Sequence, residues 1–253
     1  MRALVRRPSP RLSEGLVTHI ERTPIDPGLA QIQWDAYVRA LRQAGWQTTE
    51  VLQAPQHPDA VFVEDTVVMI DDTAIITRPG AQERTGETAG TRSALESLGA
   101  RVLSMQSGTL DGGDVLKVGD LVYVGRGGRT DAAGLAEFRR LLEPLGRTVI
   151  GVPLTKVLHL KSAVTALPDG SIIGYPPLVD DPGFFPHFRP MPEAGGSHVV
   201  DLGDGTLLMA SSAPRSADLI GELGYRPVIV DIGEFEKLEG CVTCLSVRLR
   251  ERS

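Results

Sequence analysis

Two cysteines, Cys241 and Cys244, form a C-x-x-C pair near the end of the sequence. A structural zinc site would need further cysteine or histidine ligands, and the chain has no second C-x-x-C and no H-x₃₋₅-H pair. A redox dithiol would begin a helix, whereas Leu245, Val247 and Leu249 alternate as in a strand. Inert thiols or one nucleophilic cysteine are the remaining interpretations. On a strand, Cys244 would face the polar side and Cys241 the packed side.

A nucleophilic cysteine needs a partner that exchanges protons, normally a histidine. The chain has five histidines. His159 differs from the others because it interrupts the apolar run 157–160. His187 and His198 lie in loop-like or hairpin-edge sequence. We therefore expect His159 to be the partner, with a buried structural histidine as the alternative.

Two groups of carboxylates could bind a cationic substrate. Glu64 and Asp65 follow an apolar pair, and Asp111 and Asp114 flank two glycines. Each group could instead cap a turn. Adjacent acids match the fork of N–H donors on a planar guanidinium, and a thiolate beside it could attack the central carbon. A free cysteine has a pKa near ~8.5, so a nearby cation would favour the thiolate.

The elements that must position these groups repeat along the chain. Apolar residues at helical spacing predict helices over 29–44, 86–98, 131–145 and 214–223, and a β-prone run follows each one. Glycines that can take positive φ end these helices, namely Gly45, Gly99, Gly146 and Gly224. Hairpin turns are predicted at 71–72, 119–120, 169–170 and 204–205, ahead of most of the helices, so each unit reads hairpin, helix, strand.

This pattern predicts an α/β ring of five ββαβ units. In one unit the proline-rich stretch 176–192 stands where a helix is expected. Another unit closes across the termini by pairing 242–248 with the strand 2–6. A ring points one end of every unit at a common centre, so acids, histidine and thiol should converge there. We expect residues 1–253 to form a single catalytic domain.

Composition excludes several classes of protein. Of 253 residues, 42% are apolar and 23% are charged, as in an ordinary globular protein. The net charge of 26 − 32 = −6 argues against a nucleic-acid or anionic membrane partner. No segment is apolar enough to cross a membrane, and the arginine-rich first dozen residues lack a signal-peptide core. With so few cysteines, we expect a cytoplasmic protein.

Four motifs identify a family resemblance. The sequences of 62–65 (FVED), 110–115 (LDGGDV), 158–162 (LHLKS) and 243–246 (TCLS) resemble the dimethylarginine dimethylaminohydrolase family. This family belongs to the pentein, or guanidine-modifying, superfamily. The match runs from Arg6 to about Arg248 with the motifs in family order. It implies a five-bladed α/β propeller, in agreement with the five units above.

The resemblance also implies roles for individual residues. Cys244 would be the nucleophile, His159 the acid and then the base, and Asp111 the residue that orients His159. The loop 7–15 resembles the family's lid, and Cys241 matches no functional position. The implied substrate-binding residues are Glu64 and Asp65 for the guanidinium, Asp59 and the Leu12 backbone for the α-ammonium, Arg84 and Arg129 for the α-carboxylate, and Phe62 and the Leu238 backbone for the pocket wall.

The implied activity is that of a hydrolase acting on linear amidines. It would convert Nω-methylated L-arginine to L-citrulline and di- or monomethylamine through a covalent S-alkylthiouronium, with no metal and no cofactor. One alternative is a deiminase or hydrolase for another guanidine, such as free arginine. The other is a catalytically silent guanidine-binding protein. The expected partner is a small molecule, and the sequence leaves a homodimer open.

Overall fold

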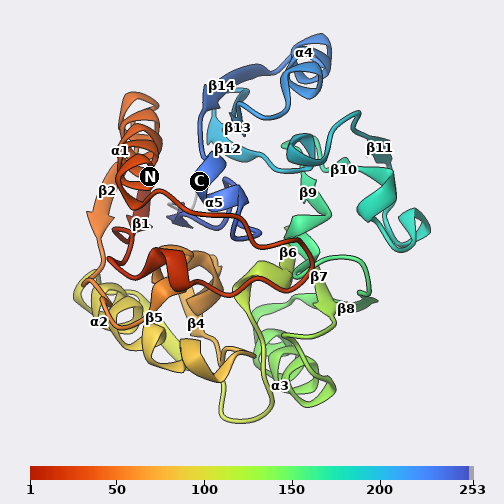
Figure 1. Cartoon of the computed structure of the whole chain (residues 1–253). Helices are drawn as coiled ribbons and strands as arrows, with labels where there is room; N and C mark the ends of the chain where they lie inside the picture. Colours follow the sequence, from red (N-terminus) through yellow and green to blue (C-terminus); the bar gives the residue numbers. More distant parts are fainter. Residues whose placement is uncertain (251–253) are drawn as a thin grey trace.

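Five three-stranded sheets are arranged in a ring (Figure 1), in the computed structural model of residues 1–250. In each sheet the middle strand pairs antiparallel with one neighbour and parallel with the other. This is the predicted arrangement of ββαβ units. The strands are β3 Val67–Ile70, β4 Thr73–Ile76 and β5 Arg101–Ser104; β6 Val115–Val118, β7 Leu121–Arg126 and β8 Thr148–Pro153; β9 Val164–Ala166, β10 Ile172–Gly174 and β11 Phe188–Pro190; β12 Val200–Gly203, β13 Thr206–Ala210 and β14 Arg226–Val230; and β15 Val247–Leu249, β1 Arg2–Val5 and β2 Gln47–Glu50.

The longer helices pack on the outside of the ring, whereas the short helix Gly233–Glu236 lies nearer its centre (Figure 1). The first begins at Pro27, where the Asp26 carboxylate accepts from two backbone N–H groups of the first turn. The chain leaves it through Gly45 at φ 84°. The third unit has short 3-10 helices in place of an α-helix, as its prolines predicted. The α-helices are α1 Pro27–Gln43, α2 Thr88–Ser97, α3 Ala132–Leu142, α4 Pro214–Glu222 and α5 Gly233–Glu236.

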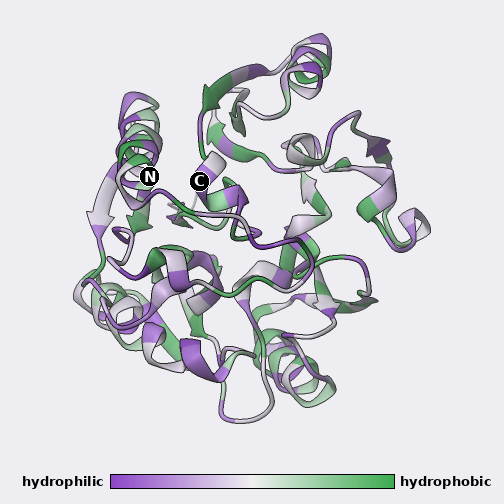
Figure 2. Ribbon diagram, in the orientation of Figure 1, coloured by the Kyte–Doolittle hydropathy of each residue, from purple (hydrophilic) through white to green (hydrophobic). Residues whose placement is uncertain are grey.

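The apolar core lies between these helices and the sheets. Hydrophilic and hydrophobic residues alternate along the helix ribbons (Figure 2), and the inward positions, such as Tyr37, Leu95 and Phe138, are fully buried. Within residues 1–250, none of the helices has both the length and the apolar composition that a bilayer crossing requires.

The unit that joins the two ends of the chain forms as predicted, with one correction. Strand β15 pairs antiparallel with β1, from Arg2↔Leu249 to Leu4↔Val247. The predicted strand over 242–248 is wrong for its first half, because 242–245 form turns. There the Cys244 N–H donates to the Cys241 carbonyl at 3.1 Å. The assignment of the two cysteines to opposite strand faces therefore fails, and both are buried.

The entry to each of three units is a 3-10 turn placed directly before or beside the inner strand. These are η3 Val63–Thr66, η5 Gly112–Asp114 and η7 Leu160–Ser162. Asp65 of the first turn accepts from Gly113 N–H at 2.9 Å. Asp114 of the second accepts from Leu160 N–H at 3.0 Å. Each acid thus caps the turn of the next unit, so the unit entries are fixed relative to one another.

Tyr37 connects α1 with the cysteine-bearing turns. Its buried hydroxyl donates to the Val242 carbonyl at 2.8 Å and lies 2.7 Å from Ser246 Oγ. We predict that Tyr37→Phe lowers the free energy of unfolding by about 1–3 kcal/mol, because two buried polar groups lose a partner. Urea denaturation measures the change. The half-buried Tyr225, whose replacement Tyr225→Phe should change stability by less than about 0.5 kcal/mol, is the control. Equal effects of the two substitutions would contradict the prediction.

Candidate active site

A narrow pocket at the centre of the ring collects most of the residues predicted for the site. The centre of a water-sized sphere can move within a volume of about 20 Å³ in this pocket. Eight of the eleven predicted residues line it, and Asp111, Leu12 and Glu64 do not. The eight are Asp59, Phe62, Asp65, Arg84, Arg129, His159, Leu238 and Cys244.

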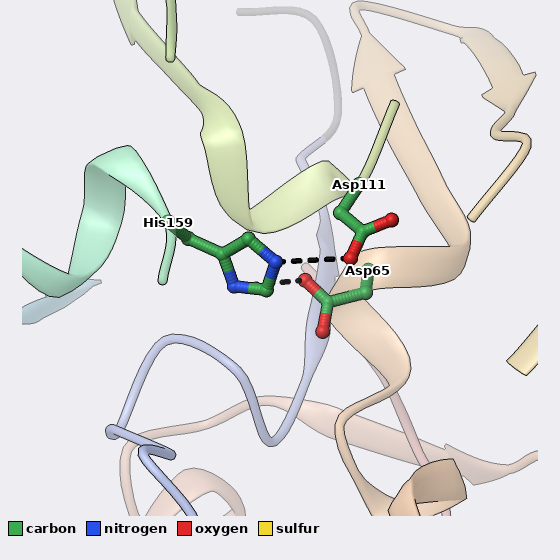
Figure 3. A group of neighbouring side chains, drawn as sticks. All are labelled: Asp65, Asp111 and His159. Carbon is green, nitrogen blue, oxygen red and sulfur yellow. Dashed lines mark hydrogen bonds and ion pairs between the residues drawn. The ribbon is translucent and has the colours of Figure 1, made fainter. Parts of the chain in front are cut away.

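His159 is held between two carboxylates in this pocket (Figure 3). Its Nε2 lies 3.0 Å from Asp111 Oδ2, and its Nδ1 lies 3.8 Å from Asp65 Oδ1. Burial disfavours the imidazolium, but the two carboxylates outweigh it and raise the pKa of His159 to about 9. Asp111 is fully buried and also accepts from Gly80 N–H at 2.8 Å. It therefore fixes the ring of His159 from behind the pocket wall.

Asp65 stays ionised although it is buried. Burial alone would raise its pKa, but His159 and Arg84 lower the pKa of this carboxyl to about 2. Arg84 Nη1 donates to Asp65 Oδ2 at 2.7 Å. Gly113 lies beneath the pair, and a Cβ there would sit 2.6 Å from both Asp65 Oδ1 and His159 Nδ1. Glycine at this position therefore lets the carboxylate and the imidazole approach each other.

The two predicted arginines differ in how much of each guanidinium is already bound. Arg84 donates to Glu87, to Asp65 and to the carbonyls of Asp59 and Phe62. Its contacts in this structure position Asp65. Arg129 is buried, and its Nη1 has no hydrogen-bond partner. An unpaired buried guanidinium nitrogen in a pocket wall is suited to an anionic group of a ligand.

The two thiols share a hydrogen bond. Cys241 Sγ lies 3.3 Å from Cys244 Sγ. Either thiol can donate to the thiolate of the other, so this bond lowers the pKa for the first deprotonation of the pair and, together with burial, raises the pKa for the second. One thiolate therefore forms easily in the pair, and a second is resisted. Only Cys244 lines the pocket.

Two of the predicted residues lie away from the pocket. Leu12 is fully buried, and its carbonyl accepts from Gly15 N–H within a 3-10 turn. Glu64 is turned by η3 to the other side of the ring, into a larger cavity of about 520 Å³. There it pairs with Lys161 at 2.6 Å and Arg248 at 2.8 Å. Adjacent positions in a 3-10 turn point in different directions, so Glu64 and Asp65 separate.

The loop that covers the pocket adds residues that the motifs did not indicate. Leu16 lines the pocket, and its N–H donates to both oxygens of Asp59 at 3.1 Å. On the opposite rim, Glu239 accepts from Thr18 N–H at 2.5 Å and His19 N–H at 3.0 Å. The covering segment thus extends beyond the predicted loop 7–15. The only sequence signal for it was the glycine before Leu16.

The carboxylates and His159 could also be considered as a metal site. Asp65, Asp111 and His159 each offer an atom within 4.8 Å of the others. A metal requires a neutral imidazole, whereas the raised pKa of His159 favours the protonated ring. Arg84 already neutralises part of the charge on Asp65. These donors therefore suit a cationic organic group better than a metal ion.

The ring of five units, with thiol, imidazole and carboxylates in its central pocket, defines the pentein class of guanidine-modifying proteins. The N-terminal domain of ArgZ, described as an arginine dihydrolase from cyanobacteria, superposes with a TM-score of 0.82 over 99% of this chain and 98% of that one. Its sequence is only 20% identical, so this likeness concerns the fold alone.

The particular family follows from closer relatives. The chain is 64% identical over 251 residues to the N(G),N(G)-dimethylarginine dimethylaminohydrolase of Streptomyces coelicolor, covering 99% of this chain and 97% of that protein. It matches the structure of a cysteine-to-serine mutant of DDAH from Pseudomonas aeruginosa, complexed with citrulline, at a TM-score of 0.91 and 33% identity over 98% of each chain. No family model matches the sequence. The chain belongs to the dimethylarginine dimethylaminohydrolase family.

The charge state of His159 gives a prediction that does not depend on the reaction. We expect its imidazole to titrate near pH 9 in NMR spectra, protonated below and neutral above. Asp111→Asn removes the carboxylate at Nε2, so the pKa should fall toward the ordinary value near ~6.5. Asp120→Asn, which alters an exposed partner of Arg147 far from the pocket, is the control. An unchanged titration in Asp111→Asn would show that Asp111 does not hold the proton on His159.

Proposed function

We propose that this chain hydrolyses Nω-methylated L-arginine to L-citrulline and di- or monomethylamine through a covalent cysteine adduct. The placement of Cys244, His159 and Asp65 around one pocket carries the proposal. The dimethylarginine dimethylaminohydrolase relatives and the citrulline complex of one of them support it. The guanidinium would lie against the ionised Asp65, whose charge stabilises the cation.

The first half of the reaction transfers the amidine carbon to sulfur. A bound guanidinium lies beside Cys244 and favours its thiolate, which attacks the central carbon. His159 donates its proton to the departing dimethylamine as the C–N bond breaks. The raised pKa of His159 supports this role, since the imidazole is protonated at neutral pH. An S-alkylthiouronium remains on Cys244.

The second half releases citrulline. His159, now neutral, takes a proton from water, and the resulting hydroxide attacks the same carbon. The C–S bond then breaks and Cys244 leaves as a thiolate. Asp111 holds His159 at Nε2 throughout, so the ring keeps its orientation while its charge changes. The free enzyme should lose activity as pH rises through about 9, because its acid becomes deprotonated.

The amino-acid end of the substrate would be bound by groups on the rim. Asp59 suits the α-ammonium, with the Leu16 backbone beside it in place of the predicted Leu12. The unpaired Nη1 of Arg129 suits the α-carboxylate. Phe62 and Leu238 form apolar walls. The covering segment is bound to Asp59 and Glu239 at the rim of the pocket, so a substrate would enter past it.

The domain organisation and the kind of substrate can also be proposed. We further propose that the five units form one catalytic domain, since the pocket takes residues from several of them. Small-molecule ligands in related structures support a small-molecule substrate. Homodimer formation, the absence of a nucleic-acid partner and a cytoplasmic location stay predictions.

The function can be tested by measuring citrulline from asymmetric dimethylarginine and from arginine. We expect dimethylarginine to be preferred, and faster turnover of arginine would overturn the assigned substrate.

Cys244→Ser should lose turnover by more than about a thousandfold yet still bind dimethylarginine, since it lacks only the nucleophile. His159→Gly should form no product at neutral pH. A variant that binds and turns over normally would refute the assigned role, and binding without turnover in the native chain would favour a silent binding protein.

Arg129 provides a separate test of how the substrate is held. We predict that Arg129→Met raises KM for dimethylarginine about ten- to hundredfold with a smaller change in kcat, because about 1.5–3 kcal/mol of charge-assisted hydrogen bonding is lost. Arg126→Met, at an exposed position of β7, should leave both constants unchanged. Equal KM values for the two variants would exclude Arg129 as a carboxylate ligand.

A further inference from the structure

Cys241 has no part in the proposed reaction, yet its side chain contacts Cys244, the proposed nucleophile. Its sulfur is 3.3 Å from Cys244 Sγ and 3.3 Å from Thr243 Oγ1. Cys244 lines the pocket, whereas Cys241 lies behind it and is 2% exposed. A reagent that enters the pocket therefore meets Cys244 first, with a second thiol already touching it from the protein side.

The backbone between the two cysteines is compatible with a disulfide. The Cys244 N–H donates to the Cys241 carbonyl at 3.1 Å, which closes a four-residue turn and holds the two Cα atoms within about 7 Å. Disulfides span Cα distances of roughly 4.4–6.8 Å. The sulfurs must approach from 3.3 Å to a bond length of about 2.0 Å. Side-chain rotation within one turn can supply this movement, so the ring of units need not open.

We propose that Cys241 and Cys244 form a site of reversible covalent modification by hydroperoxides. With the shared proton on Cys241, the Cys244 thiolate attacks one peroxide oxygen and the O–O bond breaks. The sulfur is oxidised to a sulfenic acid, and the departing oxygen takes a proton from solvent, so the peroxide is reduced to an alcohol or water. The Cys241 sulfur then attacks the sulfenic sulfur. An S–S bond forms, the S–O bond breaks, and water leaves with the second thiol's proton.

The position of Cys241 decides what oxidation does to Cys244. A sulfenic acid without a neighbouring thiol is open to further oxidation to sulfinic acid, which is irreversible in ordinary conditions. A thiol in contact intercepts it as a disulfide that thiols can reduce. The nucleophile is thereby blocked but preserved. Only the activity readout and the protection by dimethylarginine rest on the proposed function, because the covalent change itself is measured on the protein.

The test treats the reduced, purified chain with hydrogen peroxide and follows intact mass, peptide maps and activity. We expect loss of two hydrogens, an intramolecular Cys241–Cys244 disulfide, and loss of more than about nine tenths of the activity, since the thiolate is the nucleophile. Dithiothreitol should restore both the thiols and the activity. Dimethylarginine present in excess should slow the modification, because it occupies the route to Cys244.

Cys241→Ser is the matched variant, compared with itself before and after treatment. Its Cys244 should proceed to sulfinic acid, and dithiothreitol should not restore activity. Sulfinic acid at Cys244 of the native chain, with Cys241 still free, would overturn the inference. A disulfide that forms without any effect on turnover would instead overturn the proposed role of Cys244 and leave the modification site standing.

Discussion

The structure depends on keeping a dense set of charges buried at the centre of the ring. Asp65, Arg84, Glu87 and His159 are all less than a tenth exposed. Ionised groups taken out of water are costly unless they are paired and hydrogen-bonded. Arg84 meets this requirement for two carboxylates, and the imidazolium of His159 meets it for Asp65 and Asp111. The same pairing sets the charge of the proposed acid, so electrostatic compensation and chemistry have a common origin.

The ring supplies the geometry that this compensation needs. The caps from Asp65 to η5 and from Asp114 to η7 connect consecutive units at their inner ends. Hydrogen bonds of this kind leave little freedom for the turns that carry the site residues. The pocket is thus built from short, fixed turns rather than from long loops. The covering segment around Leu16 is the exception, because residues 15–26 form no helix or strand, although carboxylates at the rim bind its backbone.

Much of the fold was accessible from the sequence because its signals are local. Glycines after helices and turn pairs inside hairpins act over a few residues, and five units followed from their repetition. His159, Asp65 and Cys244 were found because polar groups interrupt apolar runs at unit entries. The direction in which a side chain points from a 3-10 turn cannot be predicted from the few residues around it. Periodicity therefore could not separate Glu64 from Asp65, and an alternating sequence after Cys241 mimicked a strand where turns occur.

The pocket-covering segment was missed for a related reason. Leu12 and Leu16 are both leucines beside small or polar residues, and only their tertiary neighbours distinguish them. Asp59 binds the backbone of Leu16, whereas Leu12 packs into the core. Likewise the unpaired nitrogen of Arg129 and the fully bound guanidinium of Arg84 differ only in which carboxylates surround them. Such differences arise from contacts between distant parts of the chain.

The pairing of Arg2 with Leu249 also bears on how the molecule reaches its working form. Closing a loop of this length carries a large entropic cost, and long-range strand pairing slows folding. During synthesis the acids and the imidazole leave the ribosome well before the sulfur. The strand β15 begins three residues after Cys244 and pairs with the first strand, so completing the sheet beside the thiol requires both ends of the chain.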